Sequence, residues 1–137
     1  MAALGAIRHD PGRHFRSLDG HKYCQLVTFR RDGTAVATPV WFASDGDRLF
    51  VKTEDPSGKV KRIRRDGRVR VAPCTVAGRL LGPPVVAMAR VLPDVETGHA
   101  ESTLRRRYGL GRRVFERVVE PILRWRGTAP LYLEIVP

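Results

Sequence analysis

The chain has 137 residues and a net charge of +11, with 42% hydrophobic and 28% charged residues. This length predicts a single domain over residues 1–137, and the composition is that of a globular protein rather than a disordered one. Apolar runs stay well short of the ~18 residues of a membrane span, and the start of the chain lacks the basic region of a signal peptide, so we expect a cytoplasmic location.

The positive charge attracts anions, whether nucleic acid, acidic lipid or a polyanionic small molecule. Only four of the 25 basic residues are lysines, and three of these, Lys52, Lys59 and Lys61, fall within ten positions of one another. Such clustering in an arginine-rich chain favours a local need for compact ammonium groups.

The first third of the chain predicts an antiparallel sheet. Tyr23–Phe29 is rich in β-branched and aromatic residues, and Asp32-Gly33 supplies a turn to a second strand over Ala35–Phe42. A further turn at Asp45-Gly46 leads to a third strand over Arg48–Thr53. Three strands joined by short glycine turns indicate a meander.

A short basic helix is predicted next. Ser57 can cap it, Val60 and Ile63 share one face, and Asp66-Gly67 ends it. The remaining positions of this helix are basic, so its other faces carry positive charge.

The rest of the chain predicts strands at Arg68–Cys74 and Pro84–Leu92, a helix over Asp94–Tyr108, an amphipathic helix over Val114–Leu123 and a last strand over Leu131–Ile135. This order, with a short helix after the third strand and a helical pair before the last one, predicts an α+β fold built on an antiparallel, barrel-like sheet.

Motifs for hydrolysis or metal binding are not found in the sequence. The four histidines have no metal-ligand spacing, and we expect surface or capping roles for them. Cys24 lies in the middle of a predicted strand and is expected to be a core residue rather than a nucleophile, and we do not expect a disulfide between Cys24 and Cys74.

The segment Val51–Arg65 has two open interpretations. A strand ends in Lys52-Thr53 and a helix opens at Ser57-Gly58-Lys59, where unpaired backbone N–H groups, a hydroxyl and ammonium groups could hold a phosphate. The alternative is a capped, solvated basic helix. A second basic stretch, Arg105–Arg107 with Arg112-Arg113, is interpreted as a solvated face, with an acidic tail, lipid headgroups or nucleic acid as further partners.

Several runs, in this order and spacing, resemble the pyridoxamine 5'-phosphate oxidase-like split-barrel superfamily, and within it the short actinobacterial oxidoreductases that depend on the deazaflavin coenzyme F420. The runs are Tyr23–Phe29, Gly33–Thr38, Pro39–Phe42, Leu49–Thr53 and Ser57–Arg62. The resemblance implies an antiparallel split β-barrel that forms a homodimer, with two cofactor sites at the subunit interface.

The resemblance also implies roles for individual residues. The positions that match the family's phosphate-binding motif are Lys52, Thr53, Ser57 and Lys59, with Lys61 and Arg62 as further candidates. The segment that matches the ring-lining strand is Thr38, Pro39, Val40 and Trp41, and Cys74 matches a less well-defined region beside the ring. It assigns neither a catalytic side chain nor a metal ligand.

The implied activity is hydride transfer between reduced F420 and an unsaturated or carbonyl-containing organic substrate. F420 carries a phosphate and a polyglutamate tail, which suit a protein of charge +11. We find no version of the C-terminal Arg and His pattern of true pyridoxamine-phosphate oxidases, which argues against vitamin B6 oxidation.

Three alternatives remain open: FMN as the cofactor, an FMN- or haem-binding barrel without catalysis, and a basic nucleic-acid-binding module. The last is disfavoured because the run Lys59–Arg70 has no aromatic residue between its cations. We expect no specific nucleic acid, no integral membrane association, and at most weak contact with an anionic membrane surface.

Overall fold

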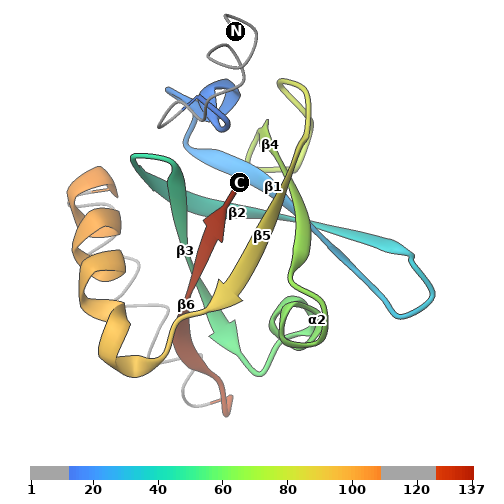
Figure 1. Ribbon diagram of the computed structural model, residues 1–137, viewed down its shortest axis with the longest axis vertical. Helices are drawn as coiled ribbons and strands as arrows, with labels where there is room; N and C mark the ends of the chain where they lie inside the picture. Colours follow the sequence, from blue (N-terminus) through green and yellow to red (C-terminus); the bar gives the residue numbers. More distant parts are fainter. Residues whose placement is uncertain (1–12, 109–125) are drawn as a thin grey trace, which may run out of the picture.

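The structure is a computed structural model, and it describes residues 13–108 and 126–137. Six strands within these residues form a closed antiparallel barrel in the order β1-β2-β3-β6-β5-β4 (Figure 1). The strands are β1 (Tyr23–Phe29), β2 (Ala35–Asp45), β3 (Arg48–Asp55), β4 (Arg68–Cys74), β5 (Val85–Val91) and β6 (Ala129–Val136). The described helical segments are η1 (Arg16–Leu18), α2 (Gly58–Arg65), η2 (Asp94–Glu96) and residues 97–108.

The predicted α+β antiparallel barrel is confirmed, including the short helix after the third strand. The second strand is longer than predicted, because Ala43–Asp45 pair with Arg48–Phe50 across the turn. The predicted helix over Asp94–Tyr108 begins as the 3-10 turn η2 and continues through residues 97–108. The second helix of the predicted pair, Val114–Leu123, lies outside the described residues.

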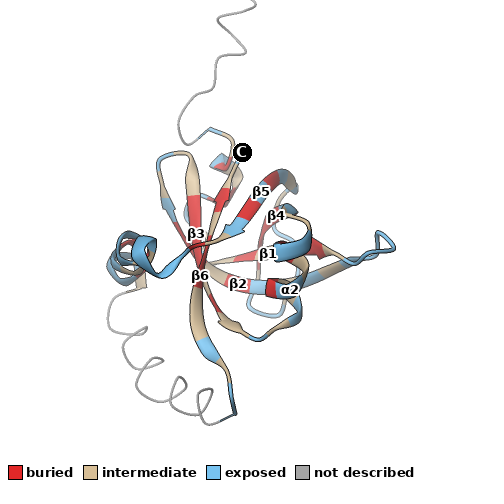
Figure 2. Cartoon of the chain, turned by 60° about the horizontal axis from the view of Figure 1, so that its bottom comes forward, coloured by how far each residue is buried: buried red, intermediate tan, exposed pale blue. Residues whose placement is uncertain are grey.

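Alternation along the strands fills the barrel interior. Inward-facing side chains from all six strands form one buried cluster, which Figure 2 shows as the red stretches of the strands. Its strand members are Cys24, Leu26, Val40, Phe42, Leu49, Val51, Val69, Val71, Ala87, Ala89, Leu133 and Ile135. Burial of this many apolar side chains is the main stabilising contribution to the barrel.

A second cluster lies outside the barrel, on the outer face of β2, β3 and β6. Ala43, Phe50 and Tyr132 face outward there, and Ala100 and Leu104 of the helix 97–108 pack on them. The helix therefore covers one side of the barrel wall, as Figure 1 shows beside β3.

Helix α2 lies between β3 and β4 in the chain and packs against β1 and β5 (Figure 1). Val60 and Ile63 are its buried residues, as predicted, and Ile63 joins the cluster inside the barrel. This burial fixes the position of both helix ends relative to the strands. In the described part of the chain, none of the helices has the length and apolar character needed to span a bilayer.

Candidate cofactor site

The end of β3 and the start of α2 bring Thr53 and Lys59 into contact. The Lys59 ammonium Nζ donates a hydrogen bond to Thr53 Oγ1 at 3.1 Å and lies 3.9 Å from Glu54 Oε1. Only 12% of the Lys59 side chain is exposed, and Thr53 is buried. The ammonium is therefore held at the end of the strand, unlike that of a solvated surface lysine.

The start of helix α2 presents backbone donors. Ser57 caps it: its Oγ accepts a hydrogen bond from the Val60 N–H at 3.4 Å, and its carbonyl oxygen accepts one from the Lys61 N–H at 3.1 Å. The first N–H groups of an α-helix have no partner within the helix, so those of Gly58 and Lys59 face outward at the positive end of the helix dipole. This arrangement suits an anion.

Arg62 folds back over the helix start. Its Nε donates to Thr28 Oγ1 at 2.7 Å, and Thr28 is fully buried on β1. A Cβ placed on Gly58 would lie only 2.7 Å from Arg62 Nη1, so the guanidinium packs where any side chain at position 58 would be. Loss of solvent around the guanidinium, and next the charges of Arg30 and Arg65, hold the pKa of Arg62 below its usual value.

A hollow of about 450 Å³ adjoins this helix start and is lined by Asp55, Pro56, Ser57, Gly58, Lys61 and Arg64. Arg64 donates two hydrogen bonds to the Asp55 carboxylate, each 3.2 Å long. Lys61 is exposed at the same hollow. Ammonium, guanidinium, hydroxyl and amide donors therefore surround the start of α2, which is the donor chemistry that a phosphate requires.

The predicted ring-lining segment alternates between the two faces of β2. Val40 is buried inside the barrel, and Thr38 pairs with the inward-facing Leu26. The Thr38 Oγ1 atom is buried and has no hydrogen-bond partner among the described residues. Because side chains alternate along a strand, Pro39 and Trp41 face outward. A cofactor ring outside the barrel would therefore contact these two side chains and the backbone of β2.

Trp41 belongs to an outer row of residues that crosses three strands. Its ring stacks on Tyr108, with centroids 5.1 Å apart and an interplanar angle of 18°, and lies 6.4 Å from the Tyr23 ring. Tyr23 pairs with Trp41 on one side and with Cys74 on the other. The structure thus brings Cys74 into the same row as Trp41.

Lys52 lies on a different face from its neighbour Thr53. Its ammonium is 5.7 Å from the centroid of the Tyr132 ring, on the outer side of the barrel. The last residue pair between β2 and β3 is Phe42 with Val51. Lys52 on β3 and Trp41 on β2 are the next residues beyond this pair, and both face outward. The structure therefore gathers Thr53, Ser57, Lys59 and Arg62 but places Lys52 nearer the ring-lining segment.

Two contributors were not predicted from the sequence. Thr28 holds Arg62 from a position 34 residues away, and nothing local in the sequence indicates that contact. Tyr108 was predicted only as a helix end; its hydroxyl donates to the Lys22 carbonyl at 2.8 Å and accepts from the Phe42 N–H at 2.8 Å. The spacing of Ala100, Leu104 and Tyr108, four residues apart, could have indicated that Tyr108 shares the packed face of the helix.

The cysteines and the second basic stretch lie apart from these donors. Cys24 is a buried core residue with a free thiol, as expected, and burial, followed by the nearby Cys74, raises its pKa. Cys74 is also free. Arg105 is exposed and pairs with Glu101 at 2.9 Å, while the Arg107 guanidinium lies 5.0 Å from the Phe42 ring centroid. Arg112-Arg113 lie outside the described residues.

The barrel order and the helix between β3 and β4 define a split-barrel protein of the pyridoxamine-phosphate-oxidase type. A family model described as Pyridoxamine 5'-phosphate oxidase matches residues 12–123, and the chain belongs to this family. No curated protein matches the chain in sequence.

Solved structures show the same fold. An F420 reductase is 20% identical, with coverage of 93% of this chain and 94% of that chain and a TM-score of 0.58. An FAD-binding protein from Mesorhizobium loti is 18% identical, with coverage of 89% and 85% and a TM-score of 0.59. A haem storage protein from Vibrio cholerae is 11% identical, with coverage of 90% and 86% and a TM-score of 0.61. At these identities the likeness concerns the fold.

Proposed function

We propose that this chain is an F420-dependent oxidoreductase, acting on an unsaturated or carbonyl-containing organic substrate. The observation that carries the proposal is the cluster of donors at the start of α2, where Lys59 is held by Thr53 and Arg62 packs on Gly58. The resemblance to the family's phosphate-binding motif implies a cofactor phosphate at Thr53, Ser57 and Lys59, and the cluster of donors supports this expectation. When bound, the deazaflavin supplies or accepts the hydride.

In this proposal the chain's own residues bind and orient the cofactor. The N–H groups of Gly58 and Lys59, the Ser57 hydroxyl and the Lys59 ammonium hold the phosphate in this proposal, and Arg62 with Lys61 adds positive charge. Because Thr53 and Glu54 already hold the Lys59 side chain, little rotamer entropy is lost when an anion binds.

The ring lies in this proposal against the outer side of Pro39–Trp41. Trp41 is fixed by its stacking on Tyr108, whose hydroxyl is tied to the backbone of β2, so the wall offered to the ring is rigid. Lys52 lies on the same outward side and adds a positive charge beside it. The proton that accompanies the hydride comes from solvent in this proposal.

A second copy of the chain completes the site. The loop after β4 exposes Val76, Leu80 and Leu81, with exposed fractions of 67%, 46% and 46%, and Cys74 of the outer row forms a bridge to Leu80. Exposed apolar side chains beside the row of Cys74, Tyr23 and Trp41 favour a subunit contact here. The proposed protein is therefore a homodimer with a cofactor site near each such contact, and we propose that it works in the cytoplasm.

Charge favours F420 over FMN. Both cofactors offer a phosphate to α2, but the polyglutamate tail of F420 adds carboxylates that a chain of charge +11 attracts. One of the similar structures is an F420 reductase, which supports the same preference. FMN is the second candidate.

The test is a fluorescence titration of the purified protein with F420 and with FMN. We expect F420 to bind at micromolar concentration or tighter, and Lys59→Ala to weaken binding by about 10- to 100-fold, the effect of losing one charge-assisted hydrogen bond. Lys22→Ala removes the same charge at an exposed position outside the site and is the matched control.

Three results contradict the proposal. If neither cofactor binds, the cofactor site is wrong, and a salt-dependent shift of labelled DNA in the same preparation would then favour a nucleic-acid-binding module. If FMN binds far more tightly than F420, the subfamily is wrong. If Lys22→Ala weakens binding as much as Lys59→Ala, the phosphate is not held at α2.

A further inference from the structure

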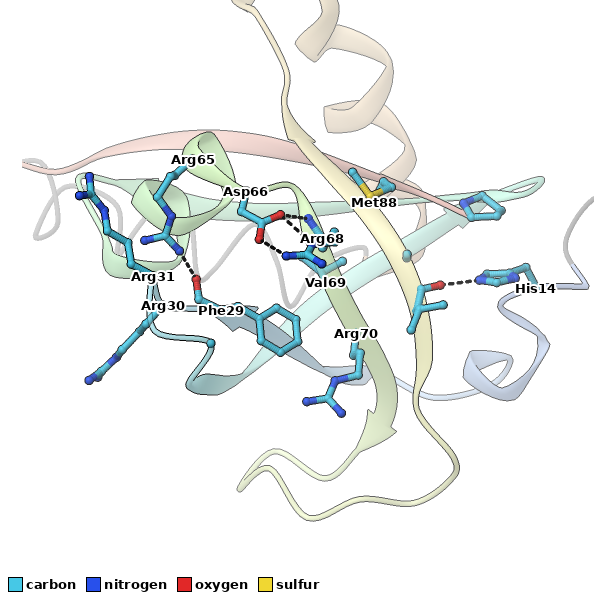
Figure 3. A pocket seen from close by; sticks show the side chains of 14 residues that line it. His14, Phe29, Arg30, Arg31, Arg65, Asp66, Arg68, Val69, Arg70 and Met88 are labelled. Carbon is cyan, nitrogen blue, oxygen red and sulfur yellow. Dashed lines mark hydrogen bonds and ion pairs between the residues drawn. The ribbon is translucent and has the colours of Figure 1, made fainter.

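A separate hollow lies on the outer face of β4 and β5, away from the start of α2. It has a volume of about 830 Å³, a size typical of small-molecule sites. The tip of the β1–β2 hairpin and the C-terminal end of α2 close its sides (Figure 3). The proposed phosphate donors stand at the opposite end of α2, so the two features are separate.

The floor of this hollow is apolar. Phe29 lines it together with the outward-facing Val86 and Met88 of β5. Val69 and Ala87 also border the hollow, but they belong to the cluster inside the barrel. Val86 is 68% exposed and Met88 is 47% exposed, although both are large apolar side chains. A concave apolar surface left open to solvent is typical of a binding site.

Five arginines surround this floor: Arg30, Arg31, Arg65, Arg68 and Arg70. Figure 3 shows them arriving from three elements around Phe29, namely the hairpin tip, α2 and β4. The Arg70 guanidinium lies 5.2 Å from the Phe29 ring centroid, and Arg65 donates to the Phe29 carbonyl oxygen.

Acidic groups neutralise this rim only in part. Among the described residues that line the hollow, Asp66 is the one acid, and it pairs with Arg68 at 3.0 Å. Asp32, on the hairpin, is close enough to Arg30 for the arginine charge to help lower the aspartate pKa. Among the residues that the structure describes, Arg30, Arg31 and Arg70 form no ion pair with a carboxylate. The charges of Arg30 and Arg65 also act on Arg62, whose pKa they help to lower, so the positive potential extends to the neighbouring helix.

We propose that this hollow binds an amphipathic organic anion, a molecule with an acyl or aromatic body and a carboxylate head. The body contacts Phe29, Val86 and Met88, and the carboxylate is held by Arg70, whose guanidinium lies beside the Phe29 ring. A guanidinium fork matches a carboxylate in geometry as well as in charge. A second copy of the chain is a poorer occupant, because a two-fold contact at this face would bring two sets of five arginines together.

The proposal is independent of the cofactor and is tested with laurate, below its micelle concentration, by isothermal titration calorimetry. We expect laurate to bind and acetate, which has the head alone, to bind far more weakly. Met88→Glu adds a like charge to the floor and is expected to weaken laurate binding by at least about tenfold. Arg70→Ala is expected to weaken it and to reduce its dependence on salt.

Val95→Glu is the matched control, because Val95 is 93% exposed on η2 and does not line this hollow. It should leave laurate binding unchanged, and Met88→Glu should leave F420 binding unchanged. The proposal is overturned if laurate does not bind, or if Val95→Glu weakens its binding as much as Met88→Glu does. It is also overturned if Met88→Glu converts a dimer to a monomer in sedimentation equilibrium while laurate still binds, since the hollow would then be a subunit contact.

Discussion

Replacing Gly58 by alanine tests the packing at the start of α2 without any cofactor. The new Cβ would lie 2.7 Å from Arg62 Nη1, which is closer than these atoms can approach, and 3.3 Å from Arg62 Cζ, which is a tight contact. The guanidinium must therefore move away, and the hydrogen bond from Arg62 Nε to Thr28 Oγ1 is lost or strained. The backbone at Gly58 is not in the left-handed region, so alanine itself is tolerated there.

Two opposing effects set the size of the change. Leaving the buried Thr28 hydroxyl without its partner costs about 1–3 kcal/mol. Alanine in place of glycine at a compatible position stabilises the fold by about 0.4–1 kcal/mol, because it lowers the entropy of the unfolded chain. The free energy of unfolding should therefore fall by roughly 0.5–2 kcal/mol in Gly58→Ala.

Equilibrium urea unfolding of a double-mutant cycle with Arg62→Met measures this directly. Without the guanidinium, the alanine meets no obstacle, so Gly58→Ala should raise the free energy of unfolding by about 0.4–1 kcal/mol in the Arg62→Met background. The sign of the effect thus reverses between the two backgrounds. If Gly58→Ala has the same effect in both, Arg62 does not pack on Gly58 and the described geometry of the helix start is wrong.

Two further predictions concern the outer wall of the barrel. Tyr108→Phe removes the hydroxyl that donates to the Lys22 carbonyl and accepts from the Phe42 N–H. The free energy of unfolding, measured by urea denaturation, should fall by about 1–2 kcal/mol. A change within experimental error would refute the role of that hydroxyl. Asp45 accepts a hydrogen bond from His99 and, next in weight, one from Arg48, and these contacts lower its pKa. A carboxylate with a lowered pKa stabilises the fold at pH values above the ordinary aspartate range, and this contribution is lost as the pH falls through the lowered value. Asp45→Asn should therefore be less stable than wild type at neutral pH and match it in acid; a difference that does not change with pH would contradict this account.

The strands and α2 could be predicted because their signals are local. Alternating apolar residues and glycine turns determine β1 to β4, and the spacing of Val60 and Ile63 predicts which side of α2 is buried. The extension of β2 to Asp45 was missed because it depends on pairing with Arg48, a partner across a turn. Strand ends are set by such pairing rather than by the residues' own preferences.

The candidate site was only partly predictable for the same reason. Ser57 and Lys59 are close in sequence to Thr53. The predicted strand, turn and helix are therefore enough to bring these three residues together. The hold of Thr28 on Arg62 depends on how α2 packs across β1, which no short stretch of sequence encodes. Lys52 and Thr53 face opposite sides of the sheet because side chains alternate along a strand. The family's phosphate-binding motif contains both residues and does not indicate this separation.

The most direct test of the cofactor proposal is the amide spectrum of the isotope-labelled protein, which at 15.4 kDa per chain is accessible to nuclear magnetic resonance. Addition of F420 should shift the amide signals of Gly58 and Lys59, where the phosphate binds, and the indole signal of Trp41, where the ring lies. The Gly58 and Lys59 shifts should be absent at the same F420 concentration in Lys59→Ala. If F420 leaves these signals in place, or shifts only residues around Phe29 and Met88, the phosphate is not bound at the start of α2.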